Sequence, residues 1–543
     1  MPLTDWLFVV AEFWGFSQMN NPSLFQAFQA SVRRHPELPA MRSGETQFTF
    51  AQLEAAATEL AAGLMALGIV RGDRVAIWGV NSIPWALAGL ALQAAGGALV
   101  PIGTRLRGRE AAGILEDSGA RFVFTDRAFG SFSFVEALLE RAPASVERIV
   151  VLDEEGTPGP DDRVINLATL RELGRSVSRE QVEERIAGGS GDDLADIIFT
   201  SGTTGKPKGV PMTQAQSLEA CRMQQAEVSH FSPGEVFAVS YPFAHNAGYR
   251  AGWQIALLEG VCAIPVSMFD ATEFMRLIEK EKVNYLPVVP TIAQAMIEHP
   301  DRDKFDLSSL RIIATGAATI PVSQVDDLRN LVGSGTTVAT GYGLTESAGS
   351  VSTTFPDDAS ETVVKTVGRP LSNLQLKILD PEHNEVPTGE RGEIAVKGPQ
   401  VMKGYYNNPE ATKAAFTQDG FLLTGDAGWL DEDGNLHIAD RIKDMYLVGG
   451  FNCYPAEIEN LMLSMDGISQ VAVIGVDDER LGQVGRAFVV RSPGSTITEE
   501  DVIAWCRKEM ANYKVPRSVR FLDALPVNNT GKIAKNELRA MAS

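Results

Sequence analysis

The segment LADIIFTSGTTGKPKG, residues 194–209, is the strongest indication of fold and chemistry in this 543-residue chain. Residues 194–199 form a short apolar run that predicts a buried strand. The loop after it is mostly Gly, Ser and Thr, and glycine lets a backbone approach an anion closely. Backbone N–H groups and hydroxyls can then surround phosphate oxygens, and two lysines add positive charge. The predicted phosphate contacts are Thr200, Ser201, Gly202, Thr203, Thr204, Gly205, Lys206 and Lys208.

This loop differs from the common phosphate-binding fingerprints. A Walker sequence needs four residues between its first glycine and Gly-Lys-Ser/Thr, whereas two residues separate Gly202 from Gly205, and Pro207 follows Lys206. A Gly/Ser/Thr-rich stretch is, by itself, more often a flexible surface loop. The preceding strand and the lysines favour phosphate binding and indicate nothing more specific.

Strands and helices alternate on both sides of the loop. Residues 74–78 and 98–102 are predicted strands that flank a helix at 83–95, which implies a parallel sheet and an α/β fold. From about residue 364 the predicted strands, such as 375–379 and 392–397, are shorter and separated by turns. Beyond about residue 444 the pattern is a smaller α+β unit. Further strands are predicted at 120–125, 148–152, 283–289, 310–315 and 471–476, and further helices near 49–68, 456–465 and 499–509.

Composition narrows the classes of partner. The net charge of -21 repels phosphate backbones and anionic lipid, so no nucleic-acid partner is expected. Four widely spaced cysteines show neither metal-ligand nor disulfide spacing, which fits the cytoplasm. Residues 6–16 are interpreted as an aromatic helix docked on the body, with a membrane-surface contact as the alternative. The uncharged stretch 83–100 contains Pro84 and Gly96-Gly97 and is interpreted as a buried helix and strand, so no transmembrane segment is expected.

Further motifs follow the phosphate loop in a fixed order. They are Thr315-Gly316-Ala317-Ala318, Gly341-Tyr342-Gly343-Leu344-Thr345-Glu346, Thr424-Gly425-Asp426, Asp440-Arg441-Ile442-Lys443-Asp444, Gly449-Gly450-Phe451-Asn452-Cys453-Tyr454-Pro455-Ala456-Glu457 and Asn529-Thr530-Gly531-Lys532-Ile533. With the loop at 200–209 they resemble the adenylate-forming superfamily, which contains acyl-CoA synthetases, luciferases and peptide-synthetase adenylation domains. The resemblance covers roughly residues 22–540. An ordered series of motifs is far more specific than any single one.

The resemblance implies a fold, a division of the chain and a reaction. The expected fold is a large N-terminal domain of parallel αβα sheets with a small β-barrel-like subdomain, followed by a small mobile α+β C-terminal domain. The expected bounds are 1–440 for the ATP- and acyl-binding domain, 441–444 for the hinge and 445–543 for the mobile domain. The implied reaction is ATP-dependent ligation of a carboxylic acid to coenzyme A through an acyl adenylate, with Mg²⁺ as the metal.

The resemblance also assigns expected roles residue by residue. The expected catalytic residues are Lys532, Thr345, Glu346 and His245, with Glu346 also holding the metal. The expected contacts with nucleotide or coenzyme A outside the loop are Gly316, Ala317, Ala318, Gly341, Tyr342, Gly343, Asp426, Arg441, Lys443, Gly449 and Gly450. In the family, rotation about the hinge exchanges the lysine loop for the Gly449-Gly450 segment between the two half-reactions, which is a known kind of conformational gate.

The chemistry requires residues of these types. A carboxylate must attack the α-phosphorus of ATP, so positive charge and a metal must offset the repulsion between two anions. Lys532 suits the first need, and Glu346 suits Mg²⁺, which usually takes only one or two protein carboxylates. Thr345 can donate its hydroxyl to the α-phosphate.

Each residue also has a plainer interpretation. Lys532 could be a solvated surface lysine, and Glu346 could simply begin a helix. Tyr342 could be a core residue, and Asp426 could be a helix cap. Arg441 could form a surface ion pair of little energetic value.

The segment Tyr241-Pro242-Phe243-Ala244-His245-Asn246-Ala247-Gly248-Tyr249-Arg250 resembles the family segment that lines the acyl site. His245 is expected to be a pocket wall, and a structural histidine is the alternative. Gly248 is expected to leave room for a bulky group. The predicted pocket residues are His245, Asn246, Tyr249, Gly316 and Gly341.

A closer resemblance concerns the acid itself. The chain resembles actinobacterial ligases that activate the bicyclic indane-propanoate left by steroid ring degradation, and a medium- or long-chain fatty acid is the main competitor. The sequence departs from that pattern in its aromatic N-terminal extension and at Cys453, where valine or isoleucine is commoner. The resembling residues are His245-Asn246, Gly248-Tyr249, Thr315-Gly316-Ala317-Ala318-Thr319, Lys443-Asp444-Met445-Tyr446 and Leu481-Gly482-Gln483-Val484-Gly485-Arg486.

Two other functions remain open at this point. A free-standing adenylation enzyme could load a carrier protein, although no carrier domain is expected after Lys532. A non-catalytic acyl-adenylate- or lipid-binding protein is disfavoured by the intact Lys532, Glu346 and Asp426. A homodimer is compatible with the sequence.

Overall fold

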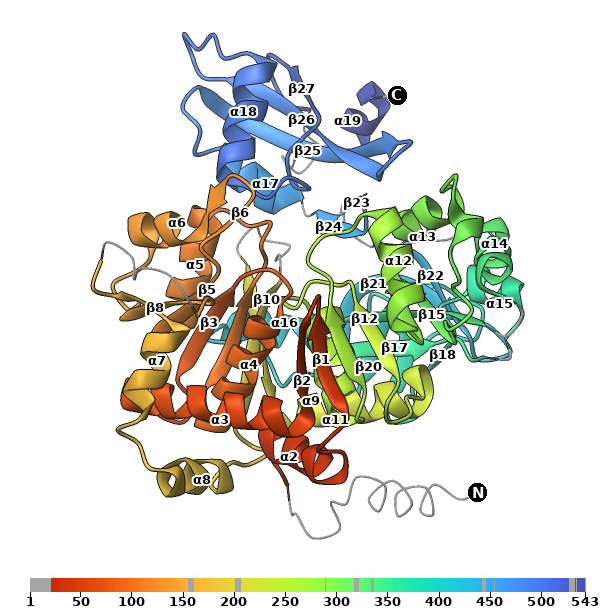
Figure 1. The fold of residues 1–543 in the computed structure, drawn as a ribbon. Helices are drawn as coiled ribbons and strands as arrows, with labels where there is room; N and C mark the ends of the chain where they lie inside the picture. The colour runs from red at the N-terminus through yellow and green to blue at the C-terminus, as the bar shows by residue number, and fades with distance from the viewer. Residues whose placement is uncertain are drawn as a thin grey trace.

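The computed structural model describes residues 21–154, 161–200, 207–288, 290–316, 322–333, 336–356, 358–441, 446–453, 455–526, 533 and 535–542. Two large sheets with covering helices form the body, and the C-terminal residues form a separate unit above it (Figure 1). The predicted α/β class is therefore confirmed. The N-terminal aromatic segment 6–16 and the hinge residues 442–444 lie outside the described part of the chain.

The seven-stranded sheet carries the phosphate loop. Its order is β11-β10-β4-β3-β5-β8-β9, with parallel pairing except between β10 and β11. The predicted strands at 74–78 and 98–102 have the bounds expected from sequence. The strands are β3 (Arg74–Trp78), β4 (Ala98–Ile102), β5 (Phe122–Thr125), β8 (Arg148–Val151), β9 (Val164–Asn166), β10 (Leu194–Thr200) and β11 (Lys208–Thr213).

The uncharged stretch 83–100 is a core helix followed by a core strand, as predicted. Helix α4 (Ile83–Ala95) begins where the Ser82 side chain accepts a hydrogen bond from the backbone of Trp85, with a proline in the first turn. It ends at Gly96, whose φ of 80° is left-handed. Nearly every residue of α4 is buried. No helix among the described residues is both long and apolar enough to cross a membrane.

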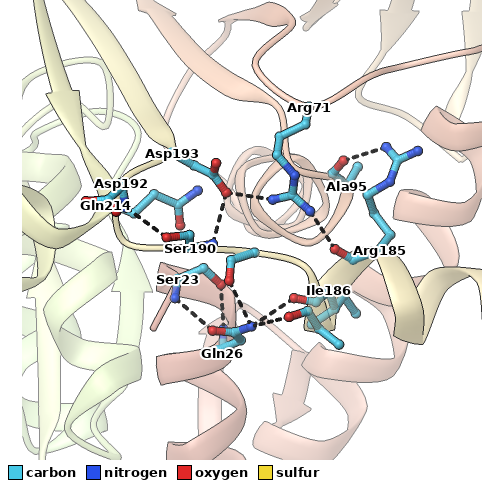
Figure 2. A network of polar contacts seen from close by, with 12 residues as sticks. Ser23, Gln26, Arg71, Ala95, Arg185, Ile186, Ser190, Asp192, Asp193 and Gln214 are labelled. Carbon is cyan, nitrogen blue, oxygen red and sulfur yellow. Dashed lines mark hydrogen bonds and ion pairs between the residues drawn. The ribbon is translucent and has the colours of Figure 1, made fainter. Parts of the chain in front are cut away.

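A polar network fixes the point where β10 enters the sheet (Figure 2). Arg71 Nη1 lies 2.6 Å from Asp193 Oδ2, and the Ser190 backbone N–H donates to the same carboxylate oxygen at 2.9 Å. Arg71 also donates to the Arg185 carbonyl at the end of α8 (Arg179–Ala187). The residue just before β10 is thereby tied to two other segments, which holds the strand that leads into the phosphate loop.

The nine-stranded sheet has the order β18-β17-β16-β15-β14-β12-β13-β1-β2. Pairing is parallel from β16 through β1 and antiparallel at the two ends. The strands are β1 (Pro39–Ser43), β2 (Thr46–Thr49), β12 (Val236–Val239), β13 (Cys262–Pro265), β14 (Tyr285–Val288), β15 (Ile312–Gly316), β16 (Thr337–Leu344), β17 (Gly349–Thr353) and β18 (Arg369–Pro370).

Two smaller sheets complete the chain. The predicted barrel-like subdomain is the curled antiparallel sheet β19 (Gln375–Leu379), β20 (Gly392–Lys397), β21 (Leu422–Leu430) and β22 (Leu436–Arg441). The C-terminal sheet contains β23 (Tyr446–Val448), β24 (Phe451–Cys453), β25 (Ile468–Asp478), β26 (Gly482–Arg491) and β27 (Ser518–Phe521). A separate two-stranded ribbon is formed by β6 (Ala128–Phe129) and β7 (Phe132–Ser133).

Helices cover both large sheets and pack on both faces of the C-terminal sheet (Figure 1). Those of the seven-stranded sheet's half are α2 (Leu24–Arg34), α3 (Phe50–Ala66), α5 (Gly108–Ser118), α6 (Phe134–Arg141), α7 (Leu167–Gly174) and α9 (Gln214–Gln224). Later in the body come η2 (Gln225–Ser229), α10 (Asn246–Gly248), η3 (Tyr249–Gln254), α11 (Ile255–Leu258), α12 (Ala271–Glu281), α13 (Pro290–Ile297), η4 (Arg302–Lys304), α14 (Val322–Val332), η5 (Thr345–Ser347), α15 (Ser360–Lys365) and α16 (Pro409–Ala415). The C-terminal helices are α17 (Pro455–Met462), α18 (Glu499–Glu509) and α19 (Lys535–Ala542).

Candidate active site

The phosphate loop is the connection of an antiparallel strand pair. Thr200 at the end of β10 lies opposite Lys208 at the start of β11, and the Thr200 hydroxyl donates to the Lys208 carbonyl at 3.4 Å. Both ends of the loop are thus held in one sheet, at the carboxyl end of β10. Active sites of open α/β sheets lie at this edge.

Two glycines predicted to meet the nucleotide lie side by side at the same edge of the other sheet. Gly316 ends β15 and is in register with Gly341 of β16. A Cβ added at Gly341 would lie 2.6 Å from the Ser352 carbonyl oxygen, and one at Gly343 would lie 2.2 Å from that of Gly349. Both positions of β16 therefore require glycine, because β17 approaches too closely for a side chain.

Tyr342 and Asp426 meet although they belong to different sheets. The Tyr342 hydroxyl donates to Asp426 Oδ2 at 2.6 Å, and Asp426 is almost fully buried within β21. The interpretation of Asp426 as a helix cap is therefore wrong, because the residue lies inside a strand. The backbone of Arg441 in β22 is in register with Asp426. A short acceptor, an aromatic ring and an arginine position converge here from three strands.

Glu346 lies in the short 3₁₀ turn η5 that follows β16, with Thr345 immediately before it. Its carboxylate accepts a hydrogen bond from the Tyr405 hydroxyl at 3.1 Å. The Lys208 ammonium lies 4.8 Å from the centre of the Tyr405 ring. The chain just after the phosphate loop and the predicted metal ligand are therefore joined through one tyrosine. No group of three His, Cys, Asp or Glu side chains that could hold a metal occurs within the described ranges.

His245 stands at the start of α10, facing the C-terminal unit. Its side chain is exposed, and no hydrogen bond reaches the imidazole from the part of the protein that the structure describes. Partial loss of hydration between the two units, together with the nearby positive charges of Arg105 and Lys514, lowers the His245 pKa to about 4. Solvent access tempers the desolvation, but both cations act in the same direction, so the ring is neutral at pH 7. This is not the setting of a structural histidine held by hydrogen bonds.

The Gly449-Gly450 segment reaches His245 from the other side. Strands β23 and β24 form a hairpin that turns at these two glycines, whose φ values of 55° and 82° favour glycine. The ring of Phe451 lies 6.3 Å from the His245 ring and 4.8 Å from that of Tyr513, and the Arg105 guanidinium lies 3.9 Å from its centre. In this arrangement the segment predicted to face coenzyme A adjoins the predicted acyl site.

Three expectations change, two of them about the acyl segment and one about Cys453. A Cβ at Gly248 would lie 2.2 Å from the Pro242 carbonyl oxygen, so this glycine permits close backbone packing and leaves no room for a bulky acid. Tyr249 is fully buried in the core, where its ring packs on Trp253 and its hydroxyl meets Gln93, so it supports the segment from behind. Cys453 is also fully buried, in the core of the C-terminal sheet, so its departure from the family pattern says nothing about the acid.

The remaining site predictions cannot be placed. The side chain of Arg441 is not described, although its backbone is. The residues outside the described part of the chain are Ser201, Gly202, Thr203, Thr204, Gly205, Lys206, Ala317, Ala318, Lys443 and Lys532.

Sequence reasoning missed several residues that join the site segments. Tyr405 bridges Lys208 and Glu346, and its only signal in the sequence is a Tyr-Tyr pair after the turn glycine Gly404. Arg105 lies on Phe451, but nothing in its local sequence points to the C-terminal unit. Such contacts join residues far apart in the sequence and leave no periodic pattern.

Comparisons with known proteins agree with this geometry. Residues 28–406 match the family model of the AMP-binding enzymes, and residues 457–532 match that of the AMP-binding enzyme C-terminal domain. The ligase of Mycobacterium tuberculosis named 3-[(3aS,4S,7aS)-7a-methyl-1,5-dioxo-octahydro-1H-inden-4-yl]propanoyl:CoA ligase is 42% identical, over 95% of this chain and 98% of its own. The ligase of the same name from Rhodococcus jostii is 39% identical, over 94% and 97%. The o-succinylbenzoate CoA synthetase of Bacillus subtilis, solved with a product analogue, has a TM-score of 0.79 at 27% identity, covering 96% of this chain and 98% of its own.

The fold and the site define an enzyme that activates a carboxylic acid with a nucleotide. The chain belongs to the AMP-binding enzyme family. It is an AMP-forming acid–thiol ligase that uses ATP, Mg²⁺ and coenzyme A, as the sequence predicted. The acyl-CoA ligase function is favoured over carrier loading and over non-catalytic binding.

Proposed function

We propose the following division of labour within the site. The phosphate loop and Lys208 hold the phosphates of ATP, Glu346 holds Mg²⁺, and Thr345 donates to the α-phosphate. Lys532 offsets the charge that develops as the carboxylate attacks. The contacts of Tyr405 with Glu346 and with Lys208 support this assignment, because they link the proposed metal ligand to the residue at the end of the loop.

The nucleoside is assigned to the region where Tyr342 meets Asp426. Here the tyrosine ring offers its face to adenine, and the buried carboxylate accepts from ribose hydroxyls. The hydrogen bond between the two side chains supports this proposal, because it orients the ring and the acceptor together. Gly316 and Gly341, which are in register on β15 and β16, are assigned to the same region.

Asp426→Ala is expected to raise the KM for ATP by roughly 10- to 100-fold, because hydrogen bonds to a charged group are worth about 1.5–3 kcal/mol. The KM for the acid should change by less than about threefold, because the carboxylate is assigned to the nucleoside. The measurement is steady-state pyrophosphate release with each substrate varied. Tyr342→Phe is the matched control, since it keeps the ring and removes only the phenol–carboxylate bond. Equal changes in both KM values would contradict the assignment.

We propose that the acid is a bicyclic, indane-type propanoate. The observation that carries this proposal is the similarity, along nearly the whole chain, to two ligases named for such a substrate. Two of the segments that resemble these ligases lie at the acyl side of the site, at His245 and at the end of β15. Another two meet in the C-terminal sheet, where Tyr446 of β23 packs on Gly475 and on Gly485 of β26, and we assign them to the thiol side.

A panel of acids tests the substrate. With ATP, Mg²⁺ and coenzyme A, the indane-propanoate is expected to give a kcat/KM at least about tenfold above those of medium- and long-chain fatty acids, since about 1.4 kcal/mol of differential binding suffices. Pyrophosphate release and acyl-CoA formation are both measured. No turnover of the bicyclic acid, with turnover of a fatty acid, would overturn the proposal. Pyrophosphate release without coenzyme A dependence would instead favour carrier loading.

We also propose a cytoplasmic location, supported by four cysteines that are all buried as thiols. A homodimer, which the sequence allows, is tested by light scattering on the sample used for the acid panel.

A further inference from the structure

A fully buried ion pair lies behind the candidate site. The Arg250 guanidinium pairs with the Asp196 carboxylate, and their side chains are 1% and 0% exposed. Arg250 is the last residue of the acyl segment and belongs to the π-helical turn η3, and Asp196 belongs to β10, four residues before Thr200. Burying two charges carries a large desolvation cost, and such pairs are not dependable sources of stability. A fully buried pair between two site segments therefore calls for a role beyond stability.

The guanidinium makes two further hydrogen bonds. Its Nε donates to the Ser217 hydroxyl of α9 at 3.0 Å, and its Nη1 donates to Asn246 Oδ1 at 2.6 Å. The planar guanidinium can donate to all of these acceptors at once in fixed directions. A lysine ammonium cannot reproduce that geometry. One side chain thus connects β10, α9 and the residue that follows His245.

Asn246 in turn contacts a third part of the site. A Cβ added at Gly349 would lie 2.6 Å from Asn246 Nδ2, so the amide packs directly on this glycine. Gly349 has a φ of 134° and opens β17, three residues after Glu346. The Asn246 amide is held by Arg250 at its oxygen end and lies on Gly349 at its nitrogen end.

We infer that Arg250 is a positioning residue, which holds Asn246 on Gly349 and so fixes the acyl segment relative to the phosphate-loop strand and the Thr345–Glu346 turn. The inference rests on the proposed function, because it assigns the acyl site to the His245 segment. Arg250 itself touches no substrate in this assignment. Its effect on the acid passes through Asn246.

The test uses variants that keep the buried charge. Removing Arg250 outright would leave Asp196 without a counter-ion and endanger folding, so the variants are Arg250→Lys, Asn246→Ala and the double variant. Arg222→Lys is the matched control, because Arg222 lies on α9, the helix that carries Ser217, and makes a two-bond pair with Glu219.

Acid-dependent ATP–pyrophosphate exchange provides the first readout. Arg250→Lys and Asn246→Ala are each expected to raise the KM for the acid about tenfold, with kcat and the KM for ATP within about threefold of wild type. The double variant should be no worse than the poorer single variant, because both changes break one connection. Multiplying effects, or an unchanged KM in Arg250→Lys, would overturn the inference.

Hydrogen exchange provides a readout that needs no substrate. Both single variants should speed exchange in residues 345–353, across the Asn246–Gly349 contact, whereas Arg222→Lys should not. Suppose that none of the acids supports pyrophosphate exchange by the wild-type protein, but that the variants still speed hydrogen exchange in residues 345–353. The proposed function then fails, while the structural connection through Arg250 stands. If wild type is active and the variants alter neither KM nor exchange in 345–353, Arg250 has only a structural role.

Discussion

Lys532→Ala is expected to abolish adenylate formation while sparing thioester formation from preformed acyl adenylate. The lysine is assigned to the charge that develops when a carboxylate attacks a phosphate, and removal of one such donor typically costs about a hundred- to a thousand-fold in rate. The thiol step has no such charge at the α-phosphate. The two half-reactions are measured separately, by pyrophosphate exchange and by acyl-CoA release from synthetic adenylate.

Lys508→Ala is the control for this experiment. Lys508 is an exposed lysine of α18 in the same C-terminal unit, so its removal matches the loss of charge. It should leave both half-reactions within about twofold of wild type. If Lys532→Ala lowered both half-reactions equally, the assignment of separate groups to the two steps would be wrong.

The second large effect is expected at the contact between the C-terminal unit and the body. Lys514 Nζ lies 3.0 Å from Glu110 Oε1 of α5, and these side chains are 5% and 12% exposed. Breaking such a pair by removing one charge is costly, because the other charge remains buried. In this arrangement of the two units the Gly449-Gly450 hairpin also lies beside His245. We assign this arrangement to the thiol-transfer step. Glu110→Gln is therefore expected to slow thioester formation at least about tenfold and to leave adenylate formation unchanged.

Charge reversal and a surface control sharpen this prediction. Glutamine is chosen because Glu110 also accepts from the Arg107 backbone N–H, a contact that an amide oxygen preserves. The double variant Glu110→Lys/Lys514→Glu should recover much of the thioester rate. Arg109→Ala removes an exposed contact with Ser464 at the same interface and should have an effect below about threefold. Equal losses in both half-reactions would show that the pair stabilises the fold and not one arrangement.

The secondary structure could be predicted where a local pattern is strong. Residues 74–78, 98–102, 375–379, 392–397 and 499–509 have the predicted bounds, because apolar periodicity and turn residues are local signals. Other strands, such as β25, extend beyond their apolar centres, because exposed residues at strand ends still pair with a neighbour.

The site was less accessible to sequence reasoning, because its geometry arises from pairing between distant segments. Gly316 and Gly341 were predicted separately, and only sheet register shows that they are neighbours. Asp426 was compatible with a helix cap until β21 placed it inside a sheet. Arg250 belongs to the acyl segment, but nothing in the sequence distinguishes its partner Asp196 from any other polar residue in a strand. No spacing of residues in the sequence predicts a buried ion pair of this kind.

The strands β1 and β2 have a consequence for how the chain folds. They close one end of the nine-stranded sheet, and Met41 of β1 pairs with Ala263 of β13. On the ribosome, the first of these strands must therefore wait until more than half of the body has been synthesised. Pairing over such a distance delays folding, and an uncovered β13 edge can recruit strands from other chains in the meantime. The first strands of this enzyme thus pair only after β13 has been made, and they then cover an edge of the sheet that carries Gly316 and Gly341.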